Sequence, residues 1–264
     1  MPTPVTRSAH PSRVYTSLAP LEAVSVTVPV GSIRIESGDV ATAQVSLAPE
    51  VADDEAADQA IAEATITEVG GSLAVTVPHR PAADGASGVT GSTVIAGGVG
   101  QIIQATGGSI TVAGGRVVSG TGLVMVPSGA VEAVLTVPAQ VRLLLDGQDV
   151  AITATGPAGQ VTASSVNGSI HLERAETVVA ITANGAVQIG EAANVEATTT
   201  NGSVRIGLVT DSAVLRATNG SIRARTTTSD FSARSLNGNV EVHAEGVSLP
   251  DSAVRTTHGL ARVR

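Results

Sequence analysis

ANGAVQIGEAANVEATTTNGSVRIGLVTDSAVLRATNGSIRAR, residues 183–225, carries three Asn-Gly pairs at an almost constant spacing. With one more pair on each side, successive pairs lie 17, 17, 18 and 18 residues apart. The five pairs are Asn167-Gly168, Asn184-Gly185, Asn201-Gly202, Asn219-Gly220 and Asn237-Gly238. A short fixed period with a similar β-rich segment after each pair is typical of chains that stack one structural unit on the next. The sequence therefore predicts a repeat protein.

Aligned on each asparagine, the units show the period of two that β-strands need. The positions three and five residues after the asparagine are aliphatic in every unit, and the positions six and four residues before it are apolar. The position four residues after the asparagine predicts an exposed polar row: His171, Gln188, Arg205, Arg223 and Glu241. Each unit thus predicts two short strands with one buried side.

Asn-Gly suits the corner between two such strands, because glycine adopts a positive φ without steric cost and asparagine tolerates it best among other residues. Two topologies fit: a solenoid with stacked parallel strands, and an antiparallel meander in which Asn-Gly forms hairpin turns. Near-identical units and small inward residues favour the solenoid. We therefore expect an all-β fold, a right-handed parallel β-solenoid (a single-stranded β-helix) of 17–18-residue coils with an N-terminal β cap.

The remaining chain divides by composition. Residues 1–17 are rich in Pro, Thr, Ser and Arg, and predict a disordered arm. Residues 18–80 predict the β cap, with a short helix near 53–64 and a hairpin turn at Gly70-Gly71. Residues 81–130 are rich in glycine and fit either an insertion or degenerate coils of the same stack. Residues 131–250 are the predicted solenoid repeats, and 251–264 a C-terminal tail or cap.

Composition excludes several function classes. The formal net charge of −8 argues against binding to nucleic acid, which depends on cations that contact phosphate. The chain has no cysteine, and its five histidines lack the spacing of a zinc site. We expect no cofactor, no metal and no integral membrane segment, since no stretch approaches the roughly 20 apolar residues of a membrane span. A soluble, cytoplasmic protein is the expectation; the oligomeric state stays open.

The segments VPVGSIRIESGD and VEAVLTVPAQVRLLL, and the units ANGAVQIG, TNGSVRIG, TNGSIRAR and LNGNVEVH, resemble bacterial adhesin-like proteins of the β-strand-repeat kind, a family of unknown function. The resemblance covers roughly residues 18–250. It implies a right-handed β-solenoid with a role in binding to surfaces, and it supplies no catalytic residues.

The candidate site is a group of arginines within residues 201–240: Arg205, Arg216, Arg223, Arg225 and Arg234. In register, Arg205 would lie over Arg223 and Arg216 over Arg234. Stacked like charges cost free energy unless an anion bridges them, so the group predicts a docking face for an acidic protein or an anionic glycan. The leading hypothesis is a non-enzymatic scaffold. A carbohydrate-active β-helix enzyme and a structural, self-assembling element are its rivals. The carboxylates of the repeats do not recur at one position, as a catalytic cluster would require.

Overall fold

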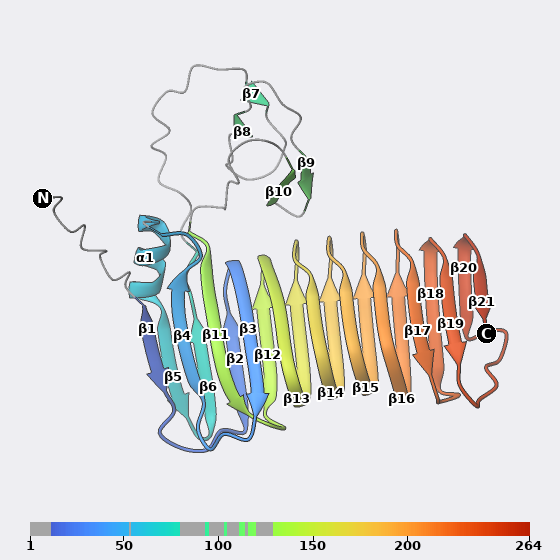
Figure 1. Ribbon diagram of the computed structural model, residues 1–264, viewed down its shortest axis with the longest axis horizontal. Helices are drawn as coiled ribbons and strands as arrows, with labels where there is room; N and C mark the ends of the chain where they lie inside the picture. Colours follow the sequence, from blue (N-terminus) through green and yellow to red (C-terminus); the bar gives the residue numbers. More distant parts are fainter. Residues whose placement is uncertain are drawn as a thin grey trace, which may run out of the picture.

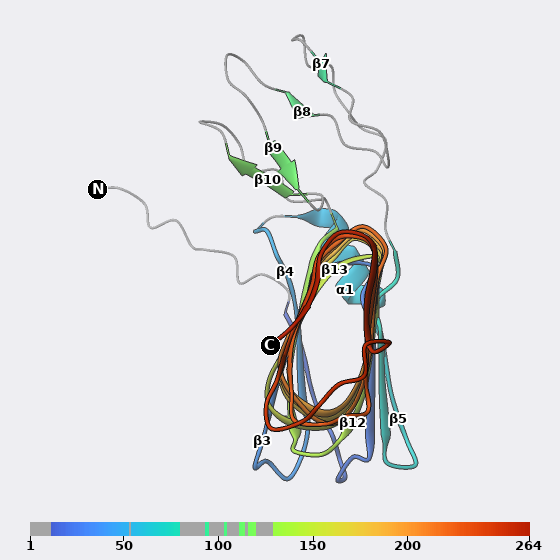
Figure 2. The same ribbon diagram turned by 90° about the vertical axis from the view of Figure 1, so that its right-hand side faces the viewer.

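The computed structural model of the chain describes residues 12–52, 54–79 and 129–264, together with the backbone of four short strands between residues 93 and 119. Its body is a right-handed parallel β-solenoid whose coils stack along one long axis (Figure 1). Viewed along that axis, each coil is a flattened loop with two long sides (Figure 2). The predicted fold class is confirmed.

The N-terminal elements are β1 (Arg13–Thr16), β2 (Ala23–Thr27), β3 (Val30–Gly38), β4 (Gln44–Pro49), α1 (Glu55–Glu63), β5 (Thr65–Val69) and β6 (Ser72–Thr76). The strands after residue 129 are β11 (Val131–Pro138), β12 (Arg142–Gly147), β13 (Asp149–Ser165), β14 (Ile170–Thr182), β15 (Val187–Thr199), β16 (Val204–Ala217), β17 (Ile222–Thr226), β18 (Phe231–Asn237), β19 (Val240–Ala244), β20 (Val254–His258) and β21 (Ala261–Val263).

Two small antiparallel pairs are described between these groups. β7 (Thr93–Val94) pairs with β8 (Ile103–Gln104), and β9 (Thr111–Ala113) pairs with β10 (Arg116–Ser119). Each pair is a separate sheet from the solenoid. The two alternatives predicted for residues 81–130 otherwise fall outside the described residues.

Each coil adds one strand to each of two facing layers. The A layer runs in the order β1, β4, β11, β3, the first parts of β13 to β16, β17, β19 and β21. The B layer runs β5, β6, β2, β12, the second parts of β13 to β16, β18 and β20. Inward side chains fill the space between the layers. The outward surfaces are called the A face and the B face below.

The repeats pair in parallel, with equivalent positions side by side. Ile170 pairs with Val187, Val187 with Val204, and Val204 with Ile222. These steps of 17 and 18 residues are the spacings of the Asn-Gly pairs. The antiparallel meander is therefore excluded, and the inward positions predicted from the alternation are buried.

The core between the layers is almost entirely aliphatic. Ile170, Val187, Val204 and Ile222, one above the other, are completely inaccessible to solvent. Small and β-branched residues suit this narrow space, because strands in the two layers face each other along the whole stack. The one phenylalanine, Phe231, belongs to the same core.

The N-terminal β region does more than cap one end of the stack. β3 pairs in parallel with β11 on one side and β13 on the other, and β2 lies between β6 and β12 in the B layer. Two chain segments about a hundred residues apart thus wind together in the first coils. β3 fits there because Ile33 and Ile35 alternate inward as the coil strands do, and both are completely buried.

The N-terminal end of the stack is closed by α1 and by strands in antiparallel pairs, β1 with β4 and β5 with β6 (Figure 1). Asp54 caps α1, because its carboxylate accepts hydrogen bonds from the backbone N–H groups of Ala56 and Ala57. Asp54 also accepts one from the N–H of Gly129, just before β11. The predicted β5–β6 hairpin is confirmed, with its turn at Gly70 and Gly71, both at positive φ.

One predicted boundary is wrong. The sequence predicts a disordered arm over residues 1–17, yet Arg13–Thr16 form β1 and pair with β4. β1 is ordered because it extends the A layer, and because the Tyr15 hydroxyl donates a 2.7 Å hydrogen bond to Glu68. At the other end, the residues predicted as a C-terminal tail or cap contain β20 and β21, which pair with β18 and β19 and add a strand to each layer. The rest of the predicted arm, residues 1–11, lies outside the described residues.

The Asn-Gly pairs lie at the corners from the B layer to the A layer, but the predicted reason for glycine is wrong. None of these five asparagines and five glycines, all within the described part of the chain, has a positive φ. Glycine is required because the coils approach closely: a Cβ on Gly185 would lie 2.0 Å from the carbonyl oxygen of Gly168, and one on Gly202 would lie 1.9 Å from that of Gly185.

The corner asparagines form a ladder of hydrogen bonds along the stack. The side-chain amide of each donates to the side-chain oxygen of the one before it, and Asn167 donates to Asp149 at the foot. Beside this ladder, hydroxyl groups of Ser or Thr donate to the backbone carbonyls of the corner, as Thr182 does to Gly168 and Thr199 to Gly185. The corners are therefore held by contacts between coils.

Candidate functional site

The five candidate arginines lie on opposite faces of the solenoid. Arg205, Arg223 and Arg225 project from β16 and β17 on the A face, whereas Arg216 and Arg234 project from β16 and β18 on the B face. All five are exposed. The structure therefore brings three of them together and separates the other two, so the five residues do not form one surface.

The predicted stacking of like charges is confirmed. Arg205 pairs in register with Arg223 on the A face, and Arg216 with Arg234 on the B face. Neighbouring parallel strands lie about 4.8 Å apart, so each pair brings two guanidinium groups onto adjacent rungs. Such a pair is unfavourable unless a counter-charge lies nearby.

Acidic residues neutralise some of these arginines. On the A face, Glu241 lies 3.5 Å from Arg223 and also contacts Arg264. Arg205 makes no ion pair with any residue that the structure describes; its neighbours in register are Gln188 and Arg223. It is thus an exposed cation beside another cation, with its hydrogen-bonding capacity available to a ligand.

The B face has its own arginine stack. Arg216 contacts Glu196 at 3.2 Å, and Arg234 lies between Arg216 and Arg255 in register. Charge alone does not distinguish the two faces. The A face differs because it carries a hollow beside its arginines.

The hollow has a volume of about 500 Å³ and opens on the A face along β15, β16, β17 and β19. Gly190 and Gly207 lie on adjacent coils at its floor, where the same outward position elsewhere holds Glu173, Arg225 or His243. Arg205, Arg223 and Arg225 line its rim. Two consecutive coils without a side chain therefore leave a gap in an otherwise covered surface.

Close packing between coils requires glycine at the floor. A Cβ on Gly190 would lie 2.3 Å from the carbonyl oxygen of Glu173, and one on Gly207 would lie 2.2 Å from that of Gly190. Real contacts of a Cβ are much longer, so a side chain at either position would force adjacent coils apart. The hollow is thus a fixed feature of the backbone.

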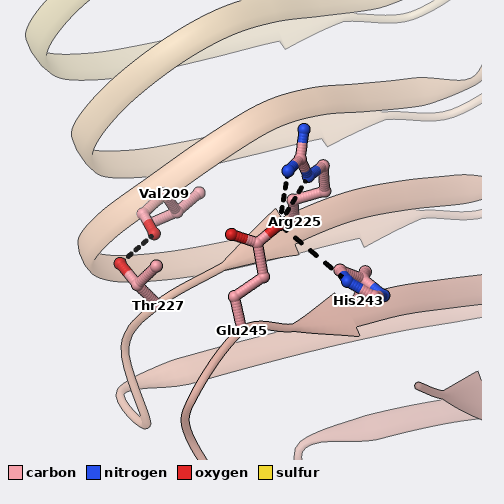
Figure 3. Close-up of polar contacts among 5 residues, drawn as sticks. All are labelled: Val209, Arg225, Thr227, His243 and Glu245. Atoms are coloured by element: carbon pink, nitrogen blue, oxygen red, sulfur yellow. Dashed lines mark hydrogen bonds and ion pairs between the residues drawn. The ribbon is translucent and has the colours of Figure 1, made fainter.

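Arg225 at the rim is held by Glu245, as Figure 3 shows. Its Nε and Nη2 atoms both donate to Glu245 Oε1, and His243 Nε2 lies 3.9 Å from the same oxygen. The hydrogen bond from Arg225 is the main cause that lowers the pKa of Glu245; desolvation opposes it, and the charges of Arg225 and His243 add to it. Nearby, the Thr227 hydroxyl donates to the carbonyl of Val209 at 3.4 Å. The rim is therefore oriented by its own contacts.

Several carboxylates of the repeats contact arginines. Glu191 contacts Arg174, Glu196 contacts Arg216, and Glu241 contacts Arg223. Among the residues that the structure describes, no three His, Asp or Glu side chains gather as a metal site would need. What the A face offers chemically is recognition of an anion by oriented guanidinium groups.

Sequence reasoning found the arginines but missed the hollow. The signal was present: glycine follows the corner asparagine by six residues in two consecutive units, ANGAVQIG and TNGSVRIG. Its meaning depends on the register of the coils, which places Gly190 and Gly207 side by side with no side chain between them.

Within the described ranges, the chain has no helix with the length and apolar character to cross a membrane. A family model, Toastrack DUF4097, matches residues 75–253, well over half of the chain. No curated protein and no solved structure matches the chain significantly. The match agrees with the β-repeat character of the predicted resemblance and assigns no adhesive activity. The chain belongs to the Toastrack DUF4097 family, whose function is unknown.

Proposed function

We propose that this protein is a non-enzymatic β-solenoid scaffold that binds an anionic macromolecule, an acidic protein or an anionic glycan, through its A face. The observation that supports it is the position of Arg205. This exposed arginine lies on the rung next to Arg223, at the edge of the hollow, with no acidic partner in the described part of the chain.

A bound anion would relieve the repulsion between the two guanidinium groups. Arg223 is already oriented by Glu241, and Arg225 by Glu245, so little side-chain freedom remains to be lost on binding. Preorganised donors of this kind bind more tightly than flexible ones, because less conformational entropy opposes association. Guanidinium also pairs with carboxylate through two parallel hydrogen bonds, which adds geometric selectivity.

The test compares equal charge changes on the two faces. Polyglutamate and polygalacturonate serve as probes in a surface-binding assay at low salt, with the unsubstituted protein and two double variants. Removing Arg205 and Arg223 (both to Ala) should weaken binding of at least one probe about tenfold or more. The matched control on the B face, Arg216→Ala with Arg234→Ala, should change it less than about twofold.

Equal losses in the two variants would show that net charge, and not the A face, drives binding, and would overturn the proposal. Absence of binding to both probes would do the same. Depolymerisation of the polygalacturonate, assayed with and without Ca²⁺, would overturn the non-enzymatic assignment. The melting temperature of each variant establishes that it is folded.

A further inference from the structure

The two glycines form one end of the hollow along the stack. Their positions on adjacent rungs span about 10 Å, since each rung adds about 4.8 Å. Glu173 lies on the N-terminal side of the glycines in the same outward row, and toward the C-terminus the lining continues through Arg225 to His243 and Arg264. Arg205 lies on the same strand as Gly207, two residues away, which is about 6.6 Å along a strand.

The lining of the hollow combines two kinds of chemistry. Its floor is formed by the two glycines and by the backbone of Ile189 and Ile206, whose side chains are buried in the core. Most of the lining surface is apolar, and the rim carries the guanidinium groups together with the carboxylate of Glu241. A simple anion would pair with the guanidinium groups at the rim and leave the floor of the hollow in contact with water. A ligand that fills the whole site needs an apolar group with carboxylates on either side.

A peptide meets this requirement for an apolar group between carboxylates better than a glycan does. Clefts that bind sugars use aromatic side chains as platforms, and the chain has one tyrosine and one phenylalanine. Phe231 is buried in the core, and Tyr15 lies in β1 at the other end of the stack. A peptide in extended conformation places alternate side chains about 6.6 Å apart, the separation of the hollow and Arg205 along β16.

We propose that the hollow over Gly190 and Gly207 receives an aliphatic side chain of an extended, acidic segment of a partner protein, whose flanking carboxylates pair with Arg205 and Arg225. This inference rests on the proposed function and narrows it to one class of ligand. Arg205 is the main anchor because it has no competing acid among the described residues, whereas Arg225 shares its donors with Glu245.

The experiment uses two labelled peptides in fluorescence anisotropy, one that contains Glu-Ser-Leu-Ser-Glu and one of equal length that contains Glu-Ser-Ser-Ser-Glu. In an extended conformation the first, third and fifth residues of each motif lie on the same side of the chain. The Leu peptide should bind at least about fivefold more tightly, because its side chain loses contact with water in the hollow. Arg205→Ala should lower the affinity for the Leu peptide about tenfold. Arg234→Ala, the matched change on the B face, should lower that affinity less than about twofold.

Nuclear magnetic resonance locates the peptide directly. The backbone amide signals of Gly190 and Gly207 should shift on addition of the Leu peptide, while that of Gly238, at a corner away from the hollow, should not. Shifts confined to other residues would overturn the inference even if the peptide binds.

The remaining outcomes separate the inference from the proposed function. Equal affinity for the Leu and Ser peptides, with dependence on Arg205, overturns the aliphatic subsite and leaves the anionic scaffold intact. Oligogalacturonate and the unlabelled Leu peptide are compared as competitors of the labelled Leu peptide. If the glycan displaces it at the lower concentration, the site is assigned to glycans; this result overturns the inference and leaves the proposed function intact. Absence of binding by every anionic probe overturns both.

Discussion

The side-chain amide of Asn184 donates a 2.7 Å hydrogen bond to the side-chain oxygen of Asn167, which occupies the same corner one coil earlier. Each asparagine in the middle of this ladder donates to one neighbour and accepts from the next. The corners of adjacent coils are therefore joined by side chains as well as by the strands, and a defect in one corner affects the coils on both sides.

Replacing Asn201 by alanine should destabilise the solenoid. The substitution removes two ladder hydrogen bonds, one to Asn184 and one from Asn219, each 2.8 Å long. At a solvent-exposed corner we expect the free energy of unfolding to fall by about 1–2 kcal/mol. Urea unfolding followed by circular dichroism measures it, with Thr200→Ala at the adjacent exposed position as the control. Equal effects of the two substitutions would contradict a role for the ladder.

Replacing Gly185 by alanine tests why glycine occupies the corners. Its φ is not positive, so an alanine there is not strained by backbone conformation. The new Cβ would instead lie 2.0 Å from the carbonyl oxygen of Gly168, and we expect a loss of more than about 2 kcal/mol.

Gly38→Ala is the matched control for that change. Nothing lies within 4 Å of a Cβ at Gly38, and its φ is also not positive. Its stability should be unchanged or slightly raised, because alanine reduces the entropy of the unfolded chain. A small effect at both Gly185 and Gly38 would refute close approach between coils as the reason for glycine at the corners.

One coil lacks the hydroxyl group that the neighbouring coils use at the corner. Thr199 and Ser235 donate to corner carbonyls, but Ala217 occupies the equivalent position between them in register. Ala217→Ser should place a hydroxyl against the carbonyl of Gly202 and raise the free energy of unfolding by about 0.5–1.5 kcal/mol. Ala197 is a fully buried core position between Ala180 and Leu215. Ala197→Ser should lower the free energy of unfolding, because the new hydroxyl would have no hydrogen-bond partner there.

The interleaved strand β3 should behave as part of the solenoid during unfolding. Ile35 is completely buried and pairs with Leu135 on one side and Ala154 on the other. Ile35→Ala should cost about 2–5 kcal/mol, as Ile189→Ala should in the middle of the stack. Both variants should unfold in one transition. A separate early transition in Ile35→Ala alone would mean that β3 belongs to a detachable cap.

The local sequence predicted the features of the fold that depend on the pattern within one repeat. The alternation around each Asn-Gly pair specified which side chains of the coils are buried, because a strand points alternate residues to opposite sides. It could not specify the place of β3, since Ile33 and Ile35 would alternate identically in a cap. Their pairing with strands about a hundred residues later is a property of the assembled stack.

In the candidate site, too, some features followed from the repeat pattern and others only from the assembled stack. The stacking of Arg205 on Arg223 followed from the period alone, whereas the separation of Arg216 onto the other face required knowing which part of each unit lies in which layer. The role of glycine at the corners was also hidden, because a close contact between coils and a positive φ select the same residue.

The hydrogen bond between Tyr15 and Glu68 joins β1 to β5 and should make stability depend on pH at both extremes. It lowers the pKa of Glu68 below its ordinary 4.5, with backbone N–H groups of Leu18 and Ala19 as further donors and desolvation in opposition. It also raises the pKa of Tyr15 above 10.0, together with desolvation and the charge of Glu68. The contribution of Glu68 is thus present above pH 4.5 and lost as the pH falls through its lowered pKa.

The contribution of Tyr15 has the opposite sign: it is present below pH 10.0 and lost as the pH rises through the raised pKa. The chain has a single tyrosine and no tryptophan, so ultraviolet absorbance reports the ionisation of Tyr15 alone. The folded protein should form tyrosinate at higher pH than the protein unfolded in urea, and Glu68→Gln should reduce that difference. Tyrosinate formation at the same pH in both states would show that β1 is not held by Glu68.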